Sequence, residues 1–246
     1  MTRNASAMVL TKLSGALCIA GLCLSCASTM GFTPRRPDVG TFPYEQVSSI
    51  PFIFVGRIVS NVEVGHQKPA PWNKYQKVQL YRVNLTVENV LQGRVDSGDL
   101  YVYYFAYWGP IGSPPGLGMS KRAGDWHIGD REMFFLRKES GKFRTICDIS
   151  DRCVVPVFSG PHPQFRINTT KPLEYNIIDL LLTRGNNADD EDMIKAIHSD
   201  RPSLFSQSYT IVKLKQLVRE EAPKVRDAAC KALLNWGQRC SSVSAR

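Results

Sequence analysis

The chain has 246 residues, of which 43% are apolar and 22% are charged, with 18 glycines and 15 prolines. This composition excludes disordered, collagen-like and multipass membrane proteins and predicts a globular fold. Lysine and arginine outnumber the acidic residues by 31 to 22, so the protein is basic without being extremely so.

The first residues predict a secretory signal peptide over residues 1–27. Arg3 and Lys12 precede an uncharged stretch over residues 13–25, which as a helix rises only about 20 Å, short of the roughly 30 Å hydrocarbon core of a membrane. Small residues before Ala27 favour cleavage after it, which removes two positive charges and leaves a net charge of +7. Acylation at Cys26, as in a lipoprotein, is the alternative.

A proline-rich, extended lead-in is expected over residues 28–46, followed by a β-rich domain over residues 47–165. Apolar and polar side chains alternate with a period of two in six segments. Strands are therefore predicted over residues 52–60, 78–91, 100–107, 132–137, 143–147 and 154–158. The second strand is too long to stay flat in a small domain and must bend. These strands predict a small antiparallel OB-like β-barrel.

After Pro172 the apolar period changes to about 3.6, which predicts a helical domain over residues 172–240 and a frayed tail over residues 241–246. Helices are predicted over residues 173–184, 189–199, 203–220 and 223–236. The acidic run at residues 189–192 suits a helix N-terminus. The expected fold is α+β: a β-barrel followed by a C-terminal α-helical hairpin domain, and we favour two domains.

Four cysteines remain after the predicted leader: Cys147, Cys153, Cys230 and Cys240. An even number in an exported chain predicts disulfides. Pairing Cys147 with Cys153 and Cys230 with Cys240 is the most economical of three connectivities, because each pair closes a short loop. A buried free thiol at Cys230 is the alternative. Neither pair has the spacing of a zinc site, and no metal or cofactor is expected.

The β-rich domain resembles the netrin-like OB-fold domain found in the tissue inhibitors of metalloproteinases, over about residues 47–158. The matching segments are residues 54–58 (FVGRI), 81–87 (YRVNLTV), 90–93 (VLQG), 100–103 (LYVY), 128–129 (IG) and 133–136 (MFFL). In that family a mature N-terminal cysteine within a Cys-x-Cys motif chelates the zinc of the target protease. Here the mature chain would begin at Ser28 and has no such motif, so metalloproteinase inhibition does not carry over.

The last two predicted helices are similar to a HEAT-type repeat, whose second helix reads Pro-x-Val-Arg-x-Ala-Ala. The corresponding residues are Pro223, Val225, Arg226, Ala228 and Ala229. Stacked repeats of this kind normally need about three neighbours. A helical cap on the barrel is the alternative.

Two predicted loops carry aromatic residues that suit an interaction surface. The loop over residues 65–76 holds Trp72 and Tyr75, and the loop over residues 107–122 begins with Tyr107 and Trp108. Aromatic side chains on loops give rigid contact area at modest entropic cost. In the alternative interpretation, the two tryptophans only close the ends of the barrel.

Candidate catalytic residues are sparse. Asp125 and His127 with Ser120 are the one set that the sequence offers for a triad assembled in space, and a turn explains them equally well. The loop over residues 159–163 is expected to leave the barrel with His162 exposed. The four histidines form no metal-binding or protease motif.

The sequence therefore predicts a secreted or periplasmic, non-enzymatic binding protein that acts through its aromatic loops. Its expected partner is an unknown protein or an anionic envelope polymer, with no specific nucleic acid and no transmembrane span after signal removal. Inhibition of an extracellular or envelope protease without zinc chelation is one alternative function. A hydrolase using Asp125 and His127 is the other.

Overall fold

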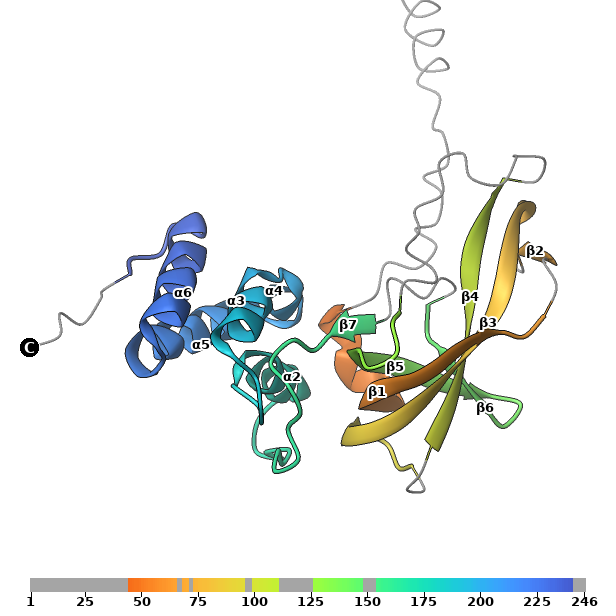
Figure 1. Ribbon diagram of the computed structural model, residues 1–246, viewed down its shortest axis with the longest axis horizontal. Coiled ribbons are helices and arrows are strands. Elements are labelled where there is room, and N and C mark those ends of the chain that lie inside the picture. The colour runs from red at the N-terminus through yellow and green to blue at the C-terminus, as the bar shows by residue number, and fades with distance from the viewer. Residues whose placement is uncertain are drawn as a thin grey trace, which may run out of the picture. The chain divides into compact units, whose positions relative to one another are not determined.

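A computed structural model describes residues 44–65, 68–70, 73–95, 99–110, 126–147 and 154–240, which belong to one compact unit (Figure 1). For residues 45, 70, 73–77 and 106–110 the backbone alone is described. The predicted leader, most of the lead-in and the tail over residues 241–246 lie outside the described residues.

Seven strands follow a short 3-10 helix, η1, at Tyr44–Ser49. Their bounds are β1 Phe52–Glu63, β2 Lys68–Ala70, β3 Asn73–Gln92, β4 Asp99–Pro110, β5 Arg131–Glu139, β6 Lys142–Thr145 and β7 Val154–Pro156. The six predicted strands are all present, most of them longer than predicted. The short strand β2 lies in a segment that was expected to be loop.

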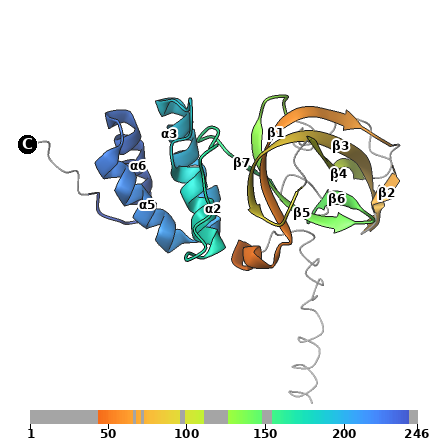
Figure 2. The ribbon, with the colours of Figure 1, turned by 90° about the horizontal axis from the view of Figure 1, so that it is seen from below.

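Five strands form a closed barrel in the order β1, β3, β4, β6, β5, and the pairing of β5 with β1 closes it (Figure 2). This confirms the predicted OB-like barrel. One pair departs from the antiparallel pattern, because β4 and β6 run parallel through Val102 with Phe143 and Tyr103 with Arg144. The strands β2 and β7 lie outside the ring, on β3 and β5.

The strand β3 curls around the barrel, as its length requires. At about 3.3 Å per residue, its 20 residues extend roughly 66 Å, far more than one barrel wall. Its final residues pair with β1, and shifts of register occur after Ile53, Val55 and Ile58 on that partner strand. Such bulges increase local twist and let paired strands coil together.

Alternation along the strands separates an interior from an exterior. The interior cluster contains large side chains from β1, β3, β4 and β5, including Phe54, Leu85, Val102 and Phe134, all fully buried. At about 25 cal/mol per Å² of apolar surface, each such side chain stabilises the fold by roughly 1.5–3 kcal/mol. The interior of the barrel is thus packed with side chains.

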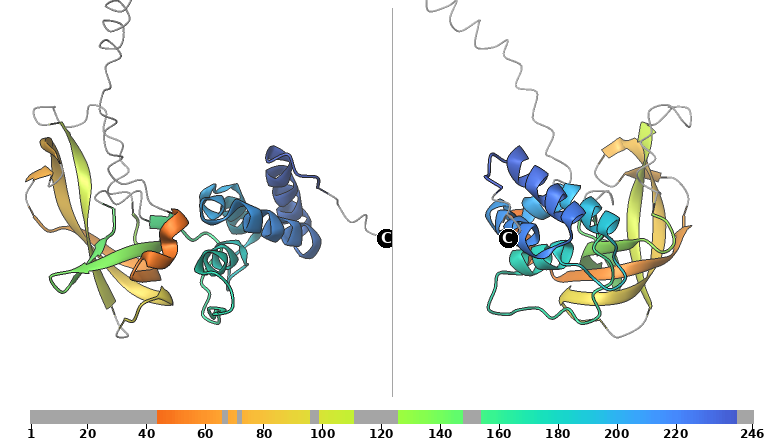
Figure 3. Two further views of the ribbon diagram at one scale, coloured as in Figure 1. Left: turned by 180° about the vertical axis from the view of Figure 1, so that it is seen from behind. Right: turned by 60° about the vertical axis from the view of Figure 1, so that its left-hand side comes forward.

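Five α-helices follow: α2 Leu173–Leu182, α3 Asp190–His198, α4 Arg201–Phe205, α5 Gln207–Glu220 and α6 Pro223–Asn235 (Figure 3). The capping role predicted for the acidic run is confirmed, since Asp189 and Asp192 form a capping box at α3. The single helix predicted over residues 203–220 is wrong. The backbone of Ser206 is extended there, and its hydroxyl accepts the Tyr209 amide and so starts α5.

The helices and one outer face of the barrel share a second apolar cluster. Ile53 and Val55 of β1 and Phe135 of β5 contribute from the barrel, and Ile177 and Leu214 contribute from the helices. These five side chains are almost completely buried. This face of the barrel wall is therefore covered by helices from the same chain rather than by solvent.

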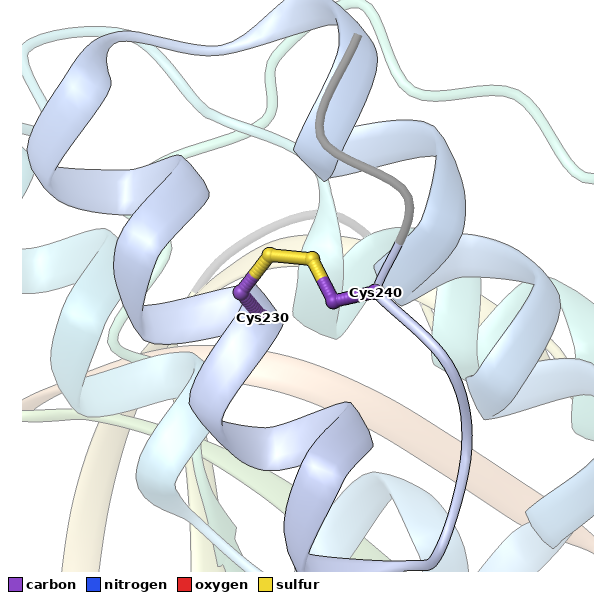
Figure 4. Close-up of a disulfide and its surroundings, with 2 residues drawn as sticks. All are labelled: Cys230 and Cys240. Atoms are coloured by element: carbon purple, nitrogen blue, oxygen red, sulfur yellow. A yellow bond between two sulfur atoms is a disulfide. The ribbon is translucent and has the colours of Figure 1, made fainter.

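The disulfide between Cys230 and Cys240 confirms one predicted pair (Figure 4). Cys230 lies on α6, and Cys240 follows the turn at Gly237, with the two Cα atoms 5.3 Å apart. Both side chains pack against the shared apolar cluster. Cys147 is buried in that cluster, whereas its predicted partner, Cys153, lies outside the described residues.

Candidate functional site

One end of the barrel is extended by β2 and by the parts of β3 and β4 that continue past β1. The pairing of β1 with β3 ends at Glu63 and Tyr81. From there β2 takes the same edge of β3, with Pro69 opposite Lys77, while Lys77 also lies opposite Gly109 of β4. These three segments form a small sheet, which we call the distal sheet.

The predicted aromatic residues fall on or beside the distal sheet. Tyr75 is in β3, whereas Tyr107 and Trp108 are in β4, so these three residues are on strands and not in loops as predicted. The register sets Tyr107 opposite Val78 in backbone pairing. Trp72, and the side chains of the other three, lie outside the described residues. The reason for the error is that β3 and β4 continue pairing beyond the closed ring.

A buried glutamine anchors the beginning of this end, and no sequence motif marks it. Gln79 is almost fully buried, and its Nε2 donates to the backbone carbonyl of Gly65. The Val64 amide also donates to the Leu80 carbonyl at 3.0 Å. A buried amide needs such partners, because leaving it unpaired costs roughly 1–3 kcal/mol. The chain leaving β1 is thereby held against β3.

A second group of residues that was not predicted from the sequence lies on the outer face of the closed barrel. Tyr101, Tyr103 and Phe105 alternate along β4 with the interior residues Val102 and Tyr104. Cationic side chains from three strands lie over their rings. The alternation of aromatic residues in this segment was a usable signal, although the origin of the cations depends on strand order.

The buried pair of Ser159 and His162 links the barrel to the helices. His162 was expected to be exposed, and this is wrong, because its side chain is buried and its Nε2 lies 3.0 Å from the Ser159 hydroxyl. That hydroxyl donates to the Leu180 carbonyl at 3.0 Å, and Asn89 of β3 donates to the His162 carbonyl at 2.8 Å. The loop is held inside the molecule by these bonds.

This pair does not have the geometry of a nucleophile and its base. A serine hydroxyl has one proton, and Ser159 directs it to Leu180, so the His162 ring must donate to Ser159 rather than accept from it. Ser159 is also completely buried. Burial lowers the pKa of His162 to about 4, with a further contribution from the Arg131 charge, so the ring is neutral.

The candidate triad remains untested. The His127 backbone amide donates to the Asp130 carboxylate at 2.8 Å, which closes a turn before β5. Asp125 and Ser120 lie outside the described residues. His127 itself is exposed.

Glu132 is a buried carboxyl group on β5. It lies between Gly56 of β1 and Pro156 of β7 in the sheet. Burial raises the pKa of Glu132 to about 8, the charge of Asp130 raises it further, and the charge of Arg201 opposes the shift. Near neutral pH the folded protein thus keeps this carboxyl largely protonated.

An open cavity of about 650 Å³ lies between the residues after β7 and helices α3 and α4. Its walls include the apolar residues Phe158 and Leu204 and the basic residues Lys195 and Arg201. Within the described ranges, no group of three or more histidine, cysteine or acidic residues is placed to hold a metal ion. In the same part of the chain, no helix is both long and apolar enough to cross a membrane.

Comparison with known protein families, with curated proteins and with solved structures finds no significant match for this chain.

The first prediction concerns acid stability. The pKa of His162 is about 4 in the folded protein, against 6.5 for an unperturbed histidine, so between these values the unfolded chain binds the extra proton. The stability contributed by the neutral ring is therefore present above pH 6.5 and is lost as the pH falls toward 4. The loss amounts to roughly 2–3 kcal/mol. In His162→Gln this pH dependence disappears.

Urea unfolding of the wild type, His162→Gln and the exposed control His198→Gln measures this effect across that pH range. The wild type and the control should lose stability in parallel on acidification, and His162→Gln should lose less. Equal slopes for all three proteins would contradict the assignment.

The second prediction has the opposite sign. Since the pKa of Glu132 is raised from 4.5 to about 8, the folded state binds the proton more tightly, and stability falls as the pH rises through that window. Glu132→Gln, which mimics the neutral acid, should become more stable than the wild type above pH 8, by on the order of a few kcal/mol. Chemical denaturation against pH measures it, with exposed Glu191→Gln as the control. A constant difference between variant and wild type at every pH would reject this prediction.

Proposed function

We propose that this protein is an exported, non-enzymatic binding protein whose partner-binding surface is the distal sheet together with the adjoining residues 65–72. The observation that supports this proposal is the pairing of the beginning of β3 with both β2 and the end of β4. This pairing brings the backbone of Tyr75 to the same end of the barrel as Tyr107 and Trp108, although they come from separate parts of the sequence.

Aromatic residues gathered at one end of a rigid scaffold are typical of binding hot spots. Tyrosine and tryptophan supply large contact areas, and they lose few rotatable bonds when a partner is bound. The scaffold here is well fixed, because Gln79 and the Val64 amide hold the start of the connection against β3. A surface placed on such strands needs little rearrangement for binding.

The strand order supports a netrin-like identity for the barrel as part of the same proposal. A closed five-stranded ring with β4 parallel to β6 is an OB-like arrangement, and the segments that resemble the family supply its strands. The HEAT-like character of α6 is supported by the burial of Val225, Ala228 and Ala229 against the other helices. A fold leaves the partner open, so the partner must be identified by experiment.

The double variant Trp72→Ala, Trp108→Ala tests the surface. A partner first identified by crosslinking to the exported protein is purified, and its affinity for wild type and variant is measured by calorimetry. We expect the variant to bind at least about thirtyfold more weakly, the loss typical of removing an aromatic hot spot. The control is Val212→Ala, Leu234→Ala, which removes exposed apolar residues from the helices.

An unchanged affinity in a stably folded double variant would remove the distal sheet from consideration. If the purified partner is a protease and its activity falls on binding, the function is inhibition. Turnover of a partner by the protein, abolished in His127→Ala, would replace binding with hydrolysis.

The exported state is tested by the intact mass of the protein recovered from outside the cytoplasm, before and after reduction. We expect a chain that begins at Ser28, without lipid, and that gains the hydrogens of its oxidised cysteines on reduction. A full-length chain found only inside the cell would contradict the proposal, and a lipid on Cys26 would change it to an anchored binding protein.

A further inference from the structure

The outer face of β4 carries a row of aromatic rings covered by cations. We define the β4 outer face by three rings and four basic side chains. These are Tyr101, Tyr103, Phe105, Lys68, Arg82, Lys142 and Arg144. All of them belong to strands of the barrel or to β2, and the rings alternate with interior residues of β4.

Each ring has a cation above it. The Arg82 guanidinium lies 4.9 Å from the centre of the Tyr101 ring, and the Lys142 ammonium lies 5.2 Å from that of Tyr103. Phe105 has two cationic neighbours. The separations fall within the range of cation–π attraction, so each ring holds the basic group above it in place.

Phe105 carries two positive charges, because the Lys68 ammonium lies 5.0 Å and the Arg144 guanidinium 5.6 Å from its centre. Phe105 itself is buried with Val78 in a small apolar cluster under β2. Two like charges over one ring repel each other, and an anion bound between them would relieve that repulsion. The geometry therefore favours an anionic ligand at this point.

Strand pairing fixes the spacing of the row. Tyr103 lies opposite Arg82 of β3 on one side and beside Arg144 of β6 on the other. Rings two residues apart along a strand are separated by roughly 6.6 Å. The cations thus form an array on a rigid sheet and not a set of mobile side chains.

Most of these cations have no acidic partner. Among the residues that the structure describes, no carboxylate lies within ion-pair distance of Lys68, Arg82 or Lys142. Glu139 borders the face, at 3.4 Å from Arg144, and it is shared with Arg137 at 2.6 Å. The face therefore has a net positive charge.

Asp99 lies at the Tyr101 end of the strand, where it accepts a hydrogen bond from Asn84 at 3.4 Å. Tyr101 remains 48% exposed beside it, so the row is open to solvent at this end. A linear ligand can therefore follow β4 from Phe105 toward Tyr101, past only one carboxylate.

We propose that the β4 outer face binds an acidic polysaccharide, whose carboxylate or sulfate groups pair with the cations along β4. Its charge complements the unpaired basic groups, and a chain with an acidic group on every sugar or every second sugar presents repeated anions to a regular array. Single-stranded nucleic acid fits less well. Its affinity for such barrels comes largely from bases stacked on free aromatic faces, and here cations lie over these rings.

This site is separate from the partner-binding surface proposed above, and neither depends on the other. The double variant at Trp72 and Trp108 leaves the described cations in place. Substitutions at Arg82 and Lys142 leave those aromatic residues unchanged.

The test compares binding of the full exported protein to labelled polygalacturonate, which is carboxylated, and to dextran sulfate. Neutral dextran, a thymidine oligonucleotide and vesicles containing phosphatidylglycerol serve as further probes. The face variant is Arg82→Gln, Lys142→Gln. Its matched control is Lys224→Gln, Lys231→Gln, which removes the same charge from exposed positions of α6.

We expect the wild type to bind at least one acidic polysaccharide and to ignore neutral dextran. The face variant should bind about tenfold more weakly, since two charge contacts are lost, and the control should stay close to the wild type. Absence of binding by the wild type, or equal losses in both variants, would overturn the proposal. Tighter binding of the oligonucleotide or of the vesicles would also overturn it, in favour of those ligands.

Discussion

The strand β1 holds the barrel together, because it forms hydrogen bonds along both edges and so closes the ring. Its partners are β3 on one side and β5 on the other. Closure fixes the orientation of every side chain on these strands: Phe54 and Ile58 enter the barrel, and Ile53 and Val55 face outward. An open sheet with the same strands would leave two edges unpaired and one apolar face exposed.

The outward side chains of β1 and β5 explain the presence of the helices. Phe135 of β5 stacks against Phe205 of α4 with ring centres 5.9 Å apart, and Phe205 also meets Tyr44 of η1 edge to face. Since the helices cover this side, ligands have access to the remaining wall and to the ends of the barrel. The two surfaces proposed for binding both involve β4, none of whose side chains belongs to the shared apolar cluster.

The chain between barrel and helices is held by polar bonds as well as apolar contacts. The Gly185 amide donates to the Ser159 carbonyl, and any side chain at Gly185 would meet that oxygen. Ser159 and His162 complete this junction on the barrel side. Their burial explains why a serine and a histidine that are three residues apart serve to join the two parts and are closed to substrates.

The class and order of the elements could be predicted from the sequence, because side-chain periodicity is local: a period of two for the barrel strands and of 3.6 for the helices. The pairing of Cys230 with Cys240 could also be predicted, since it closes a short loop. Which distant residues meet became clear only in the folded chain. The cations over Tyr101, Tyr103 and Phe105 come from β2, β3 and β6, the burial of His162 depends on α2, and the strand character of Tyr75 and Trp108 depends on pairing beyond the ring. Such contacts depend on strand order and register, which no local pattern of residues encodes.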